Sequence, residues 1–147
     1  MINRDKYNEI YLKLRSAYDI YLKTQQDSSN LSESKESSFE MAAYDAEIAV
    51  IMLLRSWADV EGIDLEGKVF PEVRVLYNIL TKQSNKLTAI TIRSNIGVIS
   101  SWHSEYGMLL GSGNDPRKKA TSDEACQEVI RAASRIFNYF DRYFVEE

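Results

Sequence analysis

Residues 48–54 read IAVIMLL, which is the longest apolar run in the chain. The run lies in a segment from 37 to 61 that holds neither glycine nor proline. A helix with one face in water would carry polar residues at regular intervals, whereas this run is apolar on almost every side. It therefore predicts a central helix that contacts neighbours on several faces. Two charged exceptions, Glu47 and Arg55, are expected on a solvated strip of that helix.

The boundaries of this central helix can be read from its flanks. Ser37 and Glu40 have the Ser-x-x-Glu spacing of a capping box, which indicates a helix start. Gly62 is well placed to end the helix after Glu61. Residues 24–38, which precede the central helix, are almost entirely polar. They predict a mobile loop, because they cannot bury enough surface to offset their ordering entropy.

The N-terminal segment, residues 3–24, predicts an amphipathic helix with Asn3 as its N-cap. Its apolar stripe is rich in tyrosine and comprises Tyr7, Ile10, Tyr11, Leu14, Tyr18, Tyr21 and Leu22. Such a stripe is typical of a core or of a dimer interface. Base stacking on the phenol rings is the alternative.

Three further helices are predicted after the central one. They span about 71–83, 88–106 and 121–144, the last opened by a second capping box, Thr121-Ser122-Asp123-Glu124. Gly97 inside the 88–106 helix suggests close packing against a neighbour. The sequence thus predicts an all-α fold: a five-helix up-down bundle that forms a single domain over residues 1–147.

Composition narrows the class of protein. The 147 residues include 18 Lys and Arg against 22 Asp and Glu, a net charge of −4, which disfavours a basic nucleic-acid coat. Cys126 is the single cysteine and is expected as a small, partly buried thiol, so neither a disulfide nor a cysteine metal cluster is predicted. We expect a cytoplasmic protein with no cofactor and no metal site. We also expect no membrane partner, because the apolar runs are too short to cross a bilayer.

Few residues could carry chemistry. His103 is the single histidine, and no Gly-x-Ser-x-Gly element accompanies it to present a nucleophile. It could bind a substrate, or it could simply interact with carbonyls near the end of its helix. Arg117, Lys118 and Lys119 form a short basic run that could contact phosphate or remain solvated.

The segment before this basic run resembles a known family. Trp102-His103-Ser104-Glu105-Tyr106-Gly107-Met108-Leu109-Leu110-Gly111-Ser112-Gly113, followed by a polar stretch and a helix beginning Thr121-Ser122-Asp123-Glu124-Ala125, resembles the HEPN superfamily. The similarity is to the type found at the C-terminus of bacterial abortive-infection proteins, and it covers about residues 90–144. It implies a helical fold, pairing into a homodimer, and a role in nucleic-acid processing or phage defence.

The departures from the family motif bear on activity. The resemblance implies an arginine and a histidine that act on the scissile phosphate and the 2′-hydroxyl. In this chain His103 stands at the arginine position and Leu110 at the histidine position, and leucine cannot transfer a proton. Arg93 lies ten residues before His103, about 15 Å away along one helix, and cannot replace the motif within one chain.

Two hypotheses follow for function. The first is a non-catalytic, HEPN-like interaction protein that forms a homodimer and binds nucleic acid or a protein through Tyr106, Arg117, Lys118 and Lys119. The second is a metal-independent ribonuclease that uses His103 with a basic residue such as Arg93 or Arg117 across a dimer. A plain structural bundle or an antitoxin-like partner remains a third class that the sequence leaves open.

Overall fold

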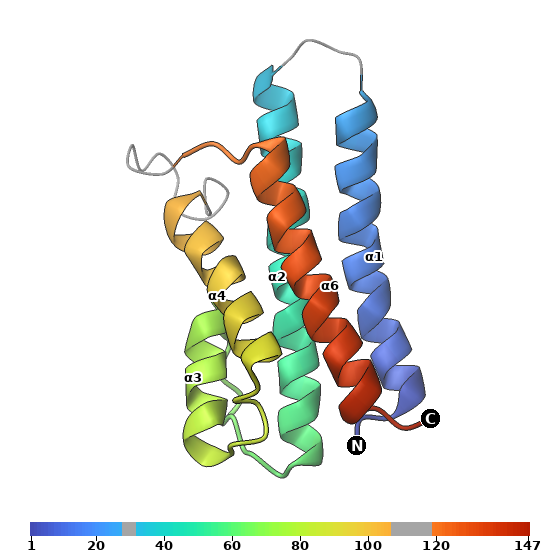
Figure 1. Cartoon of the computed structure of the whole chain (residues 1–147), viewed down its shortest axis with the longest axis vertical. Coiled ribbons are helices and arrows are strands. Elements are labelled where there is room, and N and C mark those ends of the chain that lie inside the picture. Colours follow the sequence, from blue (N-terminus) through green and yellow to red (C-terminus); the bar gives the residue numbers. More distant parts are fainter. Residues whose placement is uncertain (28–31, 107–118) are drawn as a thin grey trace.

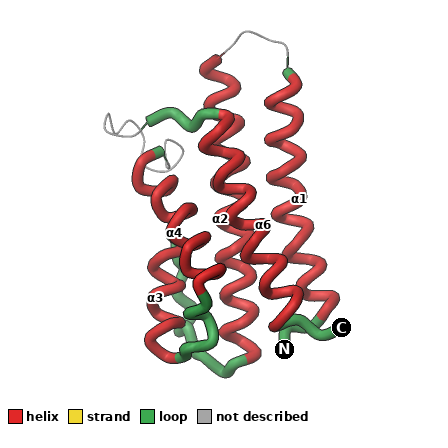
Figure 2. Tube along the Cα trace, in the orientation of Figure 1, coloured by secondary structure: helices red, strands yellow, loops and turns green. Residues whose placement is uncertain are grey.

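The computed structural model describes residues 1–27, 32–106 and 119–147, apart from the side chains of 32–34. These residues form five helices, which are α1 (Arg4–Gln26), α2 (Ser32–Val60), α3 (Val73–Gln83), α4 (Ile90–Glu105) and α6 (Asp123–Tyr143). Loops join them, and within the described residues the sole β-type pairing is an isolated bridge (Figure 2). The predicted all-α class is confirmed.

Helix α2 is central, as the apolar run predicts. It contacts α1, α3 and α6, while α6 in turn contacts α1 and α4. Figure 1 shows α1, α2 and α6 side by side, with the shorter α3 and α4 grouped along one flank. Small side chains let the neighbours approach α2 closely, because Ala42, Ala43, Ala46 and Ala49 are all fully buried.

The strict up-down order fails at α3, which runs in the same direction as α2 (Figure 1). The connection 61–72 turns back along α2 before α3 begins. Arg55 donates a hydrogen bond from Nη1 to the carbonyl of Lys68 at 2.7 Å. Further back along α2, Glu47 accepts one from the backbone N–H of Val73 at 3.0 Å. These bonds hold the connection against α2 and start α3 level with the middle of that helix.

The predicted loop over 24–38 is wrong at both ends. Helix α1 continues to Gln26, and α2 already begins at Ser32, ahead of the expected Ser37. Close to the start of α2, Phe39 is buried with its ring 5.9 Å from that of Tyr21, so the two helices pack together near these ends. Contacts between two long helices outweigh the weak helix propensity of a polar segment.

The helix ends show how local sequence acts. Gly62 adopts φ +72° after α2, and the N–H of Ile63 bonds to the carbonyl of Ala58, as in a Schellman motif. At α6 the cap lies one residue later than predicted, because the side chain of Ser122 accepts from Ala125 N–H. Thr121 instead accepts from the indole N–H of Trp102 at 3.2 Å.

The two ends of the chain meet at the base of α1 and α6. Ile2 and Val145 form a parallel bridge, with the N–H of Ile2 donating to Phe144 and that of Glu146 donating to Ile2. Arg4 adds an ion pair with Asp141 at 2.7 Å. None of the described helices has the length and apolar character that a membrane span requires.

Candidate functional site

His103 lies between two carboxylates near the end of α4. Its Nδ1 is 2.7 Å from Oε1 of Glu47, and its Nε2 is 3.2 Å from Oε1 of Glu72. Glu47 is fully buried, whereas Glu72, which precedes α3, is 43% exposed in its side chain. Glu47, His103 and Glu72 together form what we call the His103 cluster, which joins α2, α3 and α4.

The chemistry of the His103 cluster is that of a structural support. Nδ1 of the ring is within hydrogen-bond distance of Glu47, and Nε2 faces the carboxylate of Glu72 at 3.2 Å. The second oxygen of Glu47 accepts from Val73 N–H at the start of α3, where backbone donors lack helical partners. The expectation of a solvated Glu47 is therefore wrong. Its carboxylate is buried, and two hydrogen bonds compensate for the loss of water.

The other candidate residues are not gathered around His103. Arg93 is exposed, and its charge acts on Tyr77. The pKa of Tyr77 is raised overall, because burial raises it by more than Arg93 lowers it. Lys119 has an exposed side chain and bonds through its backbone N–H to the carbonyl of Glu105 at 2.9 Å. Arg117 and Lys118 lie outside the described residues.

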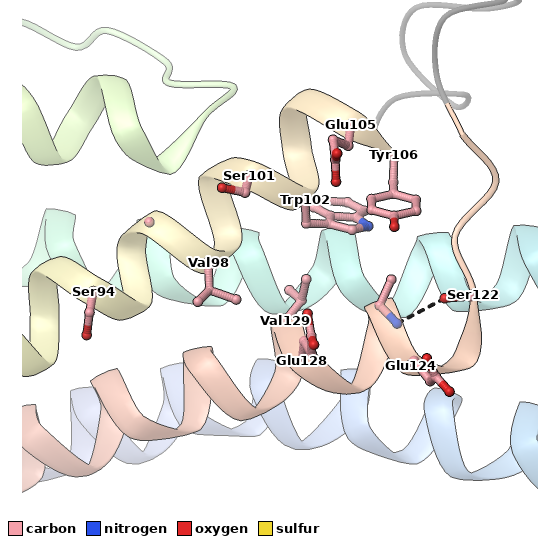
Figure 3. Close-up of a pocket in the computed structure, with 12 residues that line it drawn as sticks. Ser94, Val98, Ser101, Trp102, Glu105, Tyr106, Ser122, Glu124, Glu128 and Val129 are labelled. Atoms are coloured by element: carbon pink, nitrogen blue, oxygen red, sulfur yellow. Dashed lines mark hydrogen bonds between the residues drawn. The ribbon is translucent and has the colours of Figure 1, made fainter.

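Tyr106 lies at a groove of about 490 Å³ between α4 and α6 (Figure 3). We call this space the α4–α6 groove. Its floor is apolar and includes Val98, Trp102 and Val129. Gly97 also lines it, and a Cβ added there would meet nothing within 4 Å. The prediction that Gly97 marks close packing is therefore wrong, since the missing side chain opens the groove instead.

Three carboxylates border the α4–α6 groove. Glu105 comes from α4, whereas Glu124 and Glu128 are one turn apart on α6 (Figure 3). All three are exposed, and none makes an ion pair with any described residue. Among the described lining residues there is no lysine, arginine or histidine. The groove can therefore attract cationic groups, and it disfavours a phosphate backbone.

A second, more open hollow of about 350 Å³ continues along the same two helices toward the end of α6. Thr91 of α4 and Asn138 of α6 line it, together with Arg135 and Arg142. The guanidinium of Arg142 lies 5.4 Å from the ring centre of Tyr143. No sequence motif marks these two arginines, although they stand seven residues apart on the last predicted helix.

The tyrosine stripe of α1 divides into buried and exposed members. Tyr7 and Tyr21 are buried, and their hydroxyls donate to the carbonyl of Phe137 at 3.0 Å and to Asp123 at 2.7 Å. Tyr11 is 40% exposed and Tyr18 is 46% exposed. The stripe thus contributes to the core, as predicted, with two rings at the surface.

Cys126 is fully buried in α6, more deeply than the partial burial that the sequence predicts. Burial is the main cause that raises the pKa of its thiol to about 12, with a smaller effect of Asp123. No group of His, Cys, Asp and Glu side chains in the described part of the chain is arranged to hold a metal ion.

The buried thiol and phenols predict a loss of stability in alkali. Burial also raises the pKa of Tyr21 to about 12 and that of Tyr7 further still. Each group holds its proton more tightly in the folded state. Its contribution to folding stability is therefore complete below the pKa of the unfolded state, near 9 for Cys126 and 10 for tyrosine. That contribution falls as the pH rises toward 12. We expect the urea midpoint to drop between pH 8 and pH 10.5, and to drop less in Cys126→Ala. An equal drop in this variant would contradict a contribution from the thiol.

Comparison with known proteins gave no match to a family model, to a curated protein or to a solved structure.

Proposed function

We propose that this chain is a non-catalytic, HEPN-like interaction protein that works as a homodimer in nucleic-acid processing or phage defence. The observation that carries the non-catalytic part is the His103 cluster. A general acid or base needs a nitrogen within hydrogen-bond reach of the substrate. Both nitrogens of His103 instead face Glu47 and Glu72, and its side chain is only 8% exposed.

The geometry also weighs against a rearranged ribonuclease. Such an enzyme would need His103 and a cation such as Arg93 on the same phosphate. The two residues lie ten positions apart on α4, about 15 Å along the axis, one buried and the other exposed. Resemblance to the family supports the biological setting, and the missing histidine at Leu110 agrees with a protein that binds without cleaving.

The α4–α6 groove supports a role in binding. Its volume of about 490 Å³ is within the range of roughly 300–1,000 Å³ that is typical of ligand sites. An apolar floor with charged residues at the border is also the general arrangement of a protein interface. The acidic border favours a protein partner here over a nucleic-acid strand.

The test combines an RNA-cleavage assay with sedimentation. Wild-type protein and His103→Ala are incubated with a mixed RNA pool, and we expect no cleavage by either above the buffer blank. Glu72→Gln serves as a milder second variant, and circular dichroism checks that each variant is folded. Cleavage by the wild type that both variants lose would overturn the non-catalytic assignment. A monomer at tens of micromolar in analytical ultracentrifugation would overturn the homodimer.

A further inference from the structure

The α4–α6 groove is an open trough whose walls are one stripe from each helix. On α4 the lining positions 94, 98, 101 and 105 follow steps of four, three and four. On α6 the lining positions 124, 125, 128 and 129 form two pairs that are four residues apart. Residues at such steps are neighbours on a helix surface. Positions 94 and 105 are about 16 Å apart along the axis, which is the length of about three turns of a further helix.

The middle of the groove lets a backbone approach closely. Ser94, Gly97 and Ser101 have small side chains, and a Cβ added at Gly97 would meet nothing within 4 Å. Beside them Val98 is 37% exposed and presents apolar surface. On the opposite wall the lining includes Ala125, another small side chain. A helix laid in the groove can therefore place its apolar side chains against Val98 and the apolar floor.

The border of the groove selects the charge of its occupant. Glu105 of α4 and Glu124 and Glu128 of α6 lie on its two sides (Figure 3). These exposed carboxylates make no ion pair with any residue of the described chain. Like charges around one groove repel one another, and a cationic occupant would reverse this repulsion into attraction.

Two cations of the described chain lie near this border without neutralising it. Arg131 follows Glu128 by three residues, yet it lines a separate hollow beside α1. Lys119 bonds through its backbone N–H to the carbonyl of Glu105, and its side chain is exposed. Neither side chain forms an ion pair with a glutamate of the groove. Negative charge is therefore in excess at the groove.

The sign of the charge changes beyond the groove, and this change restricts the occupant further. The hollow that continues along α4 and α6 is lined by Arg135 and Arg142. Lysines or arginines of a partner would meet like charges there. The cations of the occupant therefore belong over the three glutamates, at one end of its length only.

We propose that the α4–α6 groove docks a basic amphipathic helix of a different protein. The apolar face of that helix lies on Val98 and the groove floor, and its lysines or arginines lie on Glu105, Glu124 and Glu128. Such helix-in-groove recognition uses apolar anchors at i, i+3, i+4 and i+7. The inference rests on the proposed role as an interaction protein and names the chemistry of the partner. It requires that the groove stays open in the homodimer.

A designed peptide tests the groove. The probe is a fluorescein-labelled helix of about four turns, with leucines at the i, i+3, i+4 and i+7 spacing. Its other positions are lysines in one half and glutamines in the other. In fluorescence anisotropy we expect the wild-type protein to bind the probe with an affinity that decreases as salt is added. No binding by the wild type at tens of micromolar would overturn the proposal.

A second peptide shows whether one-sided patterning matters. It has the composition of the probe, but its leucines are spread around the helix. We expect it to bind at least tenfold more weakly, because it cannot present a continuous apolar face to the groove floor. Equal binding of the two peptides would reduce the interaction to attraction between opposite charges and overturn helix docking.

Neutralising the border tests the charge requirement. A triple variant, Glu105→Gln with Glu124→Gln and Glu128→Gln, keeps the shape of each side chain and removes its charge. We expect this variant to bind the probe at least tenfold more weakly than the wild type. An unchanged affinity would contradict docking on these glutamates.

The matched control removes three exposed carboxylates elsewhere. Glu9→Gln with Asp19→Asn and Glu36→Gln lowers the negative charge by the same amount on α1 and α2. This control should bind the probe as the wild type does. A loss of affinity equal to that of the groove variant would show dependence on net charge alone and overturn the site.

Gly97→Leu tests the middle of the groove without altering charge. It has room for the added Cβ, and it improves helix propensity. We expect the variant to keep the wild-type melting temperature or exceed it, while its affinity for the probe falls at least tenfold. An affinity equal to that of the wild type would contradict close approach at Gly97.

Sedimentation of the same proteins separates this proposal from the homodimer. A wild-type dimer that both groove variants lose would place a second copy in the groove and overturn the proposed partner helix. A wild-type dimer that both variants retain, with weaker probe binding, would support it. A wild-type monomer that binds the probe as described would support the groove and overturn the homodimer alone.

Discussion

Replacing Glu47 with alanine should lower the free energy of unfolding by about 2–5 kcal/mol, because it leaves two buried hydrogen-bonding groups without their acceptor. Glu47 is fully buried, bonds to His103 Nδ1 at 2.7 Å and accepts from the N–H of Val73. Both donors would lose their acceptor in the interior, where water cannot replace it. Urea denaturation followed by far-ultraviolet circular dichroism measures the change.

Two further variants show whether the effect belongs to this carboxylate. Glu36→Ala removes an exposed glutamate from the same helix and should change stability by less than about 0.5 kcal/mol. Glu47→Gln keeps the shape and one acceptor oxygen, so we expect a loss of stability larger than that of Glu36→Ala and smaller than that of Glu47→Ala. A loss below about 1 kcal/mol in Glu47→Ala would show that the His103 cluster does not hold α3 and α4 to α2.

Phe137→Ala should destabilise the protein by about 3–5 kcal/mol, since it opens a cavity between α1 and α6. Phe137 of α6 is fully buried, and its ring lies 5.8 Å from that of Tyr7 and 5.9 Å from that of Tyr11. Its carbonyl also accepts from the hydroxyl of Tyr7. Truncation would remove contacts between α1 and α6 along with the buried surface of the ring itself.

Differential scanning calorimetry or urea denaturation measures this loss against two controls. Phe137→Leu keeps most of the volume and should cost less than about 1.5 kcal/mol. Asn138→Ala changes the adjacent exposed residue and should lie within about 0.5 kcal/mol of the wild type. If Phe137→Ala cost no more than Phe137→Leu, the packing of α1 on α6 at this position would be looser than the structure indicates.

The central position of α2 could be predicted because it depends on local pattern alone. An apolar run such as 48–54 needs cover on several faces, whatever the order of its neighbours. The end of this helix was also predictable, since Gly62 supplies the positive φ that a Schellman motif requires. The start was not, because α2 begins at Ser32, ahead of the capping-box spacing at Ser37 from which a start can be read.

The His103 cluster could not be predicted for a different reason. Glu47 precedes His103 by 56 residues, and their contact depends on how the 61–72 connection turns back along α2. No spacing rule relates side chains on helices whose relative direction is unknown. The isolated glutamate of an apolar helix was nevertheless a usable signal, since a charge in such surroundings needs a buried partner.

The surface along α4 and α6 could be predicted only in part. The order of charges on the last helix, acidic at 124 and 128 and then basic at 131, 135 and 142, follows from the sequence and a helical period. Which face of α6 meets α4 does not follow. Gly97 illustrates the ambiguity, because a helical glycine can either admit a close neighbour or leave a space, and the structure shows a space.

The bridge between Ile2 and Val145 has a kinetic consequence. It joins residues 143 positions apart, so its formation must close a loop of nearly the whole described chain, which carries a large entropy cost early in folding. We expect α1, α2 and α6 to be assembled before the ends pair. Contacts formed after the transition state slow unfolding and leave the folding rate almost unchanged. The joined ends would thus govern how long a molecule stays folded, independently of how quickly it folds.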